Sequence, residues 1–293
     1  MFEPATLISY AQAVVLGLLQ GFAELFPISS LGHSVILPGL LGWDIHQNDS
    51  FFLTFLVGTH FATALVLLGF FWRDWVRIVR GLWRSLRDRE IAPGDADAKL
   101  GWLLVVGTIP AGILGLTLEK PLRHLFASPE SAAVFLFLNG FVLYAAEQLR
   151  RRAPGPDRSA GDADVRISQH IRWREAVGVG TAQSLALIPG FSRSGATMGG
   201  GLLVGLSNED AARYAFLLAT PIIGAAAALK LPELLGSEGS GVRGQTLVGA
   251  ACAAVTAYFS VRFLMRFFET NRLTPFAVYC LFAGAVSFLV LAL

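Results

Sequence analysis

The chain has 293 residues, of which 54% are hydrophobic and only 15% are charged, with a formal net charge of +2 and a mean hydropathy of +0.58. Because about 25% of the residues in an ordinary soluble domain are charged, this composition argues against a soluble enzyme, a nucleic-acid-binding protein and a disordered protein. The two cysteines both lie inside apolar runs, which argues against a disulfide framework or a cysteine-based metal site.

Four apolar segments are too short to cross a membrane and form two pairs: residues 7–22 with 35–42, and residues 176–189 with 197–206. The first pair flanks the polar stretch from Glu24 to His33, and the second flanks the stretch from Pro189 to Thr197. Lipid cannot hydrogen-bond to irregular backbone, so such backbone must be buried in protein or line a wet cavity. Each pair is therefore predicted to be a re-entrant hairpin of half-helices.

Six further apolar runs are long enough, or nearly so, to cross a hydrocarbon core, which takes about 20 residues. They are residues 51–72, 100–118, 132–148, 211–229, 246–266 and 274–293. The predicted fold is an all-α integral membrane protein with six full transmembrane helices and two re-entrant pairs of half-helices.

The distribution of basic residues predicts the orientation. Residues 73–99 and 149–174 each contain seven Arg or Lys, whereas residues 42–50 contain none. The positive-inside rule places both basic segments in the cytoplasm, and alternation along the chain then places both termini outside. A set of four arginines is predicted to form a basic face near anionic lipid headgroups: Arg77, Arg80, Arg84 and Arg87.

A weak internal repeat supports this topology, since a shift of 163 residues places Gln20 on Gln183 and Ser29 on Ser192. Each copy contains a re-entrant pair followed by three spans, so the second copy is predicted to be inverted in the bilayer. Inverted repeats with broken helices are typical of transporters. The chain is divided into a pseudo-repeat at about 1–148, a basic cytoplasmic linker at about 149–173 and a second pseudo-repeat at about 174–293, all within a single membrane domain, residues 1–293.

The first polar stretch combines a carboxylate with a hydroxyl and an imidazole. Glu24 lies four residues after Gln20, so the two side chains share a helix face, and a carboxylate at membrane depth costs about 2.5–3.5 kcal/mol. It is therefore expected to face a cavity, a partner or an ion. Ser30 and His33 are three residues apart, close enough for the imidazole to act as a base on the hydroxyl.

The second polar stretch contains Arg193 at the start of a Gly-rich half-helix. A helix N-terminus attracts anions, and a guanidinium suits phosphate oxygens. Together the two stretches predict a phosphoryl-transfer site with a carboxylate and an amide for a divalent cation. Structural roles for these residues are the alternative. A lone serine in a membrane helix, such as Ser30, is usually a packing residue, and a buried Glu–Arg pair is as often a structural salt bridge as a functional site. His60, inside a span, is interpreted as a hydrogen-bonding residue of the helix bundle rather than a ligand.

In these residues the chain resembles the undecaprenyl-pyrophosphate phosphatase (bacitracin-resistance) family. The first family motif corresponds to Gln20-Gly-Phe-Ala-Glu24 and Pro27-Ile-Ser-Ser-Leu-Gly-His33, and the second to Pro189-Gly-Phe-Ser-Arg-Ser-Gly-Ala-Thr197. Two departures stand out, namely Gln20 where many members have Glu, and Leu31 where Thr is common. Either departure is compatible with a paralogue that acts on a different lipid phosphate.

The resemblance implies hydrolysis of the C55 polyprenyl diphosphate in the bacterial inner membrane, which recycles the lipid carrier for cell-wall synthesis. It implies that Glu24, Ser30, His33 and Arg193 are catalytic, with the nucleophile left open between Ser30 and His33. It implies diphosphate binding by Gln20, Ser29, Ser192, Ser194, Gly195 and Thr197, and a divalent cation, Mg²⁺ or Ca²⁺, at Gln20 and Glu24. The expected partners are the lipid substrate, membrane lipids and a second copy of the chain, with no nucleic acid, and the site is expected to open outward. The alternative is a transporter or flippase that uses the same site at the membrane midplane.

Overall fold

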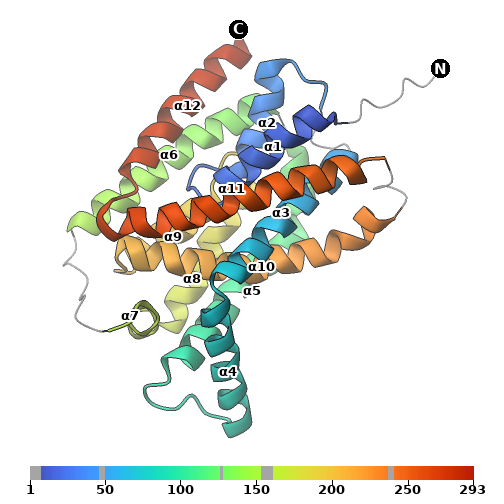
Figure 1. The fold of residues 1–293 in the computed structure, drawn as a ribbon. Helices are drawn as coiled ribbons and strands as arrows, with labels where there is room; N and C mark the ends of the chain where they lie inside the picture. The colour runs from blue at the N-terminus through green and yellow to red at the C-terminus, as the bar shows by residue number, and fades with distance from the viewer. Residues whose placement is uncertain (1–7, 46–49, 126–127, 153–160, 237–240) are drawn as a thin grey trace.

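The computed structural model describes residues 8–45, 50–125, 128–152, 161–236 and 241–293. Within these ranges the chain is helical and has no strand, which confirms the predicted all-α fold (Figure 1). The elements are α1 (Tyr10–Ala23), α2 (Ser30–Leu41), α3 (Ser50–Phe70), α4 (Trp72–Asp88), α5 (Ala96–Leu125), α6 (Pro129–Arg152), α7 (Ala163–His170), α8 (Trp173–Gln183), a 3₁₀ turn η1 (Ser184–Leu187), α9 (Arg193–Leu203), α10 (Asn208–Leu235), α11 (Arg243–Thr270) and α12 (Thr274–Ala292).

Six of these helices are long and apolar enough to cross a membrane, namely α3, α5, α6, α10, α11 and α12. Each corresponds to one of the six predicted spans, although α3 ends two residues before its predicted span and α12 one residue before, so the chain is a multi-pass membrane protein. Helix α10 runs through the middle of the bundle, where every residue from Tyr214 to Ala219 is fully buried. This stretch is surrounded by protein on all sides, which explains why it is apolar on every face.

The four short helices form the two expected pairs, α1 with α2 and α8 with α9. None exceeds 14 residues, which is too short to cross a bilayer. Helix α2 begins at Ser30 and α9 at Arg193, so each starts in the polar stretch, ahead of its apolar run, and Arg193 lies at the start of its half-helix as predicted. The Ser29 and Ser192 hydroxyls cap these helices, so the polar residues belong to their first turns. The re-entrant course and the inverted repeat remain predictions.

Small residues allow α1, which ends at the first polar stretch, to pack in direct backbone contact with α11. A Cβ atom added to Gly17 would lie 2.3 Å from the Gly249 carbonyl oxygen, and one added to Gly21 would lie 2.1 Å from the Ala253 carbonyl oxygen. Close backbone contact through small residues is the usual way in which helices associate without a hydrophobic driving force. Helix α1 is therefore held firmly against a full span, and the position of its C-terminal end follows from that contact.

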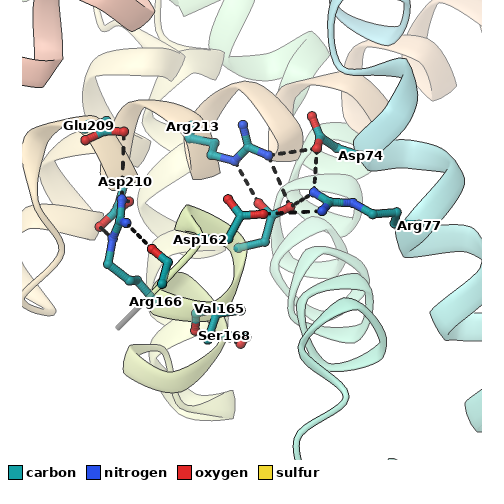
Figure 2. A network of polar contacts seen from close by, with 11 residues as sticks. Asp74, Arg77, Asp162, Val165, Arg166, Ser168, Glu209, Asp210 and Arg213 are labelled. Carbon is teal, nitrogen blue, oxygen red and sulfur yellow. Dashed lines mark hydrogen bonds and ion pairs between the residues drawn. The ribbon is translucent and has the colours of Figure 1, made fainter. Parts of the chain in front are cut away.

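A network of ion pairs joins α4, α7 and α10 at the end of the bundle away from the chain termini (Figures 1 and 2). Asp164 of α7 contacts Arg77 of α4 and Arg213 of α10, each at 2.7 Å. The predicted basic face is therefore incomplete, because Arg77 pairs with aspartates and Arg84 pairs with Asp95 at 2.9 Å. The predicted linker also contains a docked helix, α7, because its buried Asp164 pairs with arginines of α4 and α10.

Candidate active site

The two polar stretches, far apart in the sequence, meet at one place in the structure. The Ser194 hydroxyl of the second stretch donates to the Phe26 carbonyl of the first at 3.1 Å. Asn139 of α6 joins both stretches, because its amide donates to the Pro27 carbonyl at 3.1 Å and its oxygen accepts from the Ser192 backbone N–H at 3.1 Å. These contacts fix the ends of α1 and α9 relative to each other.

Two glycines permit this close approach. A Cβ atom added to Gly32 would lie 2.8 Å from the Gly190 Cα atom. Gly190 has φ of +106°, a conformation that residues with a Cβ atom rarely adopt. A side chain at Gly32 would push the two stretches apart, and a Cβ atom at Gly190 would lie 2.4 Å from the Ala132 carbonyl oxygen of α6, so both positions require glycine.

Glu24 is the centre of the site and is only 6% exposed. Its Oε1 accepts from Arg193 Nη2 at 2.9 Å and Nε at 3.3 Å. Its Oε2 accepts from the Ser30 hydroxyl at 2.5 Å and from Gln20 Nε2 at 3.0 Å. The structure thus brings together four of the residues singled out in the sequence, from α1, α2 and α9 and the turn that follows α1.

The buried carboxylate is compensated by its neighbours, but two polar atoms around it are not. Gln20 Oε1 and Arg193 Nη1 are buried and have no hydrogen-bond partner. Leaving a buried donor or acceptor unpaired costs about 1–3 kcal/mol. One is an acceptor suited to a cation and the other is a cationic donor suited to an anion, so the pair is complementary to a metal-bound phosphate.

The divalent cation implied by the resemblance fits this donor set. A carboxylate oxygen of Glu24 and the free amide oxygen of Gln20 are hard oxygen ligands of the kind that Mg²⁺ and Ca²⁺ prefer. Across the residues that the structure describes, no cluster of three or more His, Cys, Asp or Glu side chains is suited to a metal. A cation at this site therefore depends on the amide of Gln20 as well as on acidic side chains.

His33 does not contact Ser30, so the predicted contact between hydroxyl and imidazole is wrong. His33 Nδ1 lies 2.7 Å from the Ser29 carbonyl oxygen, and Nε2 lies 2.8 Å from the Tyr279 hydroxyl. A carbonyl only accepts, so Nδ1 carries the proton and Nε2 accepts from Tyr279 in the neutral ring. The imidazole folds back along α2, whereas the Ser30 hydroxyl turns toward Glu24.

The other residues assigned to the diphosphate have partners within the protein. The Ser192 hydroxyl accepts from the Gly195 backbone N–H at 3.1 Å and lies 3.0 Å from the Ser194 hydroxyl. The Thr197 hydroxyl donates to the Arg193 carbonyl at 2.8 Å. Ser29, with φ of +69°, accepts from the Gly32 backbone N–H at 3.1 Å. These contacts shape the two helix starts, and the assignment of these residues to substrate binding stays a prediction.

Sequence reasoning missed two residues at this site. His60 of α3 was assigned to hydrogen bonding within the bundle, yet its Nε2 lies 3.3 Å from Glu24 Oε2. Asn139, which is 1% exposed, was not singled out. Both are polar residues inside apolar spans, and that property alone is a signal of function.

Comparisons with known proteins agree with this geometry. The chain is 51% identical to an undecaprenyl-diphosphatase of Mycolicibacterium paratuberculosis and 50% identical to one of Mycobacterium avium, in each case over 98% of both chains. It is 46% identical to undecaprenyl-diphosphatase 2 of Frankia alni, over 95% of this chain and 97% of the relative. The family model described as Bacitracin resistance protein BacA matches residues 13–286. The chain therefore belongs to the BacA bacitracin resistance family.

Proposed function

We propose that this protein hydrolyses undecaprenyl diphosphate to undecaprenyl phosphate and inorganic phosphate. The observation that carries the proposal is that Ser30 and Arg193 both hydrogen-bond to Glu24. Arg193 Nη1 has no hydrogen-bond partner and can therefore bind an anion. The names of the relatives, which match over nearly the whole chain, supply the substrate. The alternative of a flippase is not favoured, because these relatives are named for hydrolysis.

The contacts of Glu24 define the first chemical step. The Ser30 hydroxyl donates a hydrogen bond to Glu24 Oε2, so the carboxylate can take up the hydroxyl proton as the hydroxyl oxygen attacks the terminal phosphorus. The new bond is between Ser30 Oγ and phosphorus, and the bond that breaks joins phosphorus to the bridging oxygen. The lipid monophosphate leaves, and water later releases phosphate from Ser30. Of the two candidate nucleophiles, this geometry favours Ser30.

Arg193 and His33 act on the charges of the diphosphate. Arg193 keeps Glu24 ionised through Nη2 and presents Nη1 to a phosphate oxygen, where a planar guanidinium is effective. Once Tyr279 releases Nε2, His33 takes up a proton from solvent at that atom and, as an imidazolium at the start of α2, is positioned to pass this proton to the leaving monophosphate. Gln20 and Glu24 would hold a divalent cation, Mg²⁺ or Ca²⁺ by family resemblance, whose charge offsets that of the diphosphate.

The cellular setting follows from the same family and from the charge pattern. We place the chain in the bacterial inner membrane with both termini outside, because the basic segments 73–99 and 149–174 favour the cytoplasm. The site then opens to the outer face. The partners are the polyprenyl diphosphate, the surrounding membrane lipids and a second copy of the chain.

The test is phosphate release from undecaprenyl diphosphate by the purified full-length protein in detergent, with and without chelator. We expect release that Ser30→Ala abolishes and that Arg172→Ala leaves intact, because Arg172 is exposed and pairs only with nearby Glu175. Movement of the lipid across vesicles with no phosphate produced would contradict hydrolysis and favour the flippase.

A further inference from the structure

His60 places an imidazole at the reacting centre. The residue lies in α3, and its Nε2 is 3.3 Å from Glu24 Oε2, the oxygen that also accepts from Ser30. Helix α3 is otherwise an apolar span, so an imidazole that reaches the buried carboxylate from it is unusual. Neither the family motifs nor the proposed mechanism gives this residue a role.

The other ring nitrogen settles which atom of His60 faces Glu24. Nδ1 lies 2.8 Å from the Leu56 carbonyl oxygen, which can only accept, so Nδ1 carries a proton. With a second proton on Nε2 the contact with Glu24 is an ion pair. In the neutral ring the lone pair of Nε2 faces the carboxylate oxygen, and a metal cation between the two atoms would satisfy both. A histidine that donates one N–H to a backbone carbonyl is also the usual arrangement of a metal ligand.

The neighbouring atoms complete a donor set. Gln20 Oε1 is a buried acceptor without a partner, and Gln20 also contacts Glu24 through Nε2. Ligand atoms about 2.1 Å from one ion are about 3.0–3.4 Å apart in octahedral or tetrahedral geometry, and the separation of 3.3 Å between His60 Nε2 and Glu24 Oε2 lies in that range. Glu24 thus contacts both His60 of α3 and Gln20 of α1, and the Gln20 side chain carries a free acceptor beside that contact.

We propose that His60 is a third ligand of the divalent cation, together with Glu24 and Gln20. The inference rests on the proposed function, because it concerns the cation of that reaction. With Gln at position 20 the site has one formal carboxylate, and His60 supplies the additional ligand. An imidazole suits Mn²⁺, Co²⁺ or Zn²⁺ better than Ca²⁺, so the site prefers a transition metal ion to Ca²⁺.

The test measures metal binding directly. The purified full-length protein is stripped with chelator, dialysed and titrated with Mn²⁺, and the free ion is followed by electron paramagnetic resonance. Spin-echo modulation from a ¹⁴N nucleus then reports whether a nitrogen binds the metal. We expect this modulation in the wild type and in His33→Ala, because both nitrogens of His33 are already engaged. We expect it to be lost in His60→Ala and His60→Gln.

The affinity of each variant for Mn²⁺ tests whether His60 itself binds the metal. His60→Ala is expected to raise the Kd for Mn²⁺ by about 100-fold, at the upper end of what loss of a partner to a metal site costs. His60→Gln is expected to raise it less, because its amide oxygen can still bind the ion. His170→Ala, which removes an exposed imidazole from α7, is the matched control and is expected to change nothing. Calcium should compete with Mn²⁺ only weakly.

Two results would overturn the proposal. Unchanged affinity and ¹⁴N modulation in a folded His60→Ala protein would make His60 an ion-pair partner of Glu24, with a proton in place of the metal. Absence of Mn²⁺ binding by the wild type would have the same consequence even if phosphate release continued. Failure of the wild type to release phosphate would contradict the proposed function instead, and it would leave the metal-binding result unaffected. Size-exclusion chromatography and circular dichroism establish that each variant is folded.

Discussion

The clusters around Glu24 and around Asp164 both bury a carboxylate against guanidinium groups. The Asp164 side chain is 2% exposed and that of Glu24 is 5% exposed, so burial does not distinguish them. Asp164 Oδ1 accepts from Arg213 at 2.7 Å, and Oδ2 accepts from Arg77 at 2.7 Å and from Arg213 at 3.1 Å. Figure 2 shows that Arg77 and Arg213 also pair with Asp74, at 2.7 and 2.9 Å, so every carboxylate of this cluster has guanidinium partners within the protein.

The Glu24 cluster differs in what it leaves unpaired. It contains a bare acceptor, Gln20 Oε1, and a bare cationic donor, Arg193 Nη1, whereas the Asp164 cluster leaves only one nitrogen of Arg77 without a partner. A polar cluster that serves only to hold helices together gains nothing from unpaired atoms, since each costs free energy. An acceptor and a donor left bare on either side of one carboxylate indicate that a cation and an anion complete the site.

The strongest test of this comparison removes the bare donor. Arg193→Ala is expected to lower kcat/KM for phosphate release by about 10³-fold or more, because a positioned cationic donor is lost from a buried site. Arg193→Lys is expected to recover part of that loss, since an ammonium keeps the charge but not the fork. Near-normal release by Arg193→Ala would place the Glu24 cluster in the same structural class as the Asp164 cluster.

His33 provides the second test, because it lies at the edge of the Glu24 cluster without touching the carboxylate. His33→Ala is expected to lower kcat by about 10²- to 10³-fold through loss of acid catalysis. Tyr279→Phe removes only the hydroxyl that bonds to Nε2 and is expected to cost a few-fold. Steady-state phosphate release at saturating lipid measures both, and equal losses in the two variants would argue for a shared structural role.

Asn139 tests whether the geometry of the Glu24 cluster depends on the contact between the two polar stretches. Asn139→Leu leaves the Pro27 carbonyl and the Ser192 N–H without their partner. A displacement of the reacting groups by about 1 Å can cost about 10²-fold, and we expect kcat to fall by about 10- to 100-fold with less change in KM. The exposed Asn271→Ala is the control. A folded Asn139→Leu protein with normal kcat would show that the stretches hold their positions without this bridge.

The sequence predicted most of the fold because apolar length is a strong signal in a membrane protein. All six spans were found, since a bilayer requires a nearly continuous apolar run. Helix α7 was taken as part of a basic linker, because its eight residues become helical through ion pairs with α4 and α10 that no local pattern reveals. The apolar runs alone do not mark the starts of α2 and α9, because serine caps allow polar residues to begin a helix.

The motifs predicted the centre of the site but not its outer contacts. Gln20, Glu24, Ser30 and Arg193 were assigned to one site from two motifs, and they lie in contact. His60 could not be placed, because nothing in the spacing of α3 indicates which face meets α1. The partner of His33 was predicted wrongly for a similar reason, since spacing along a helix does not determine which of several neighbours a side chain contacts.

Asp164→Asn tests the other side of the comparison, and the smallest change in activity is expected there. It removes the buried carboxylate that Arg77 and Arg213 share and leaves both paired with Asp74, which we expect to lower the free energy of unfolding by about 2–3 kcal/mol. This is below the cost for a fully buried pair, because the Arg77 side chain is 42% exposed. Unfolding in increasing sodium dodecyl sulfate measures the loss, and kcat/KM at a temperature where the variant is folded should stay within about twofold of wild type. A tenfold loss of activity without a loss of stability would mean that the ion pairs of α4, α7 and α10 control the site rather than only holding the helices together.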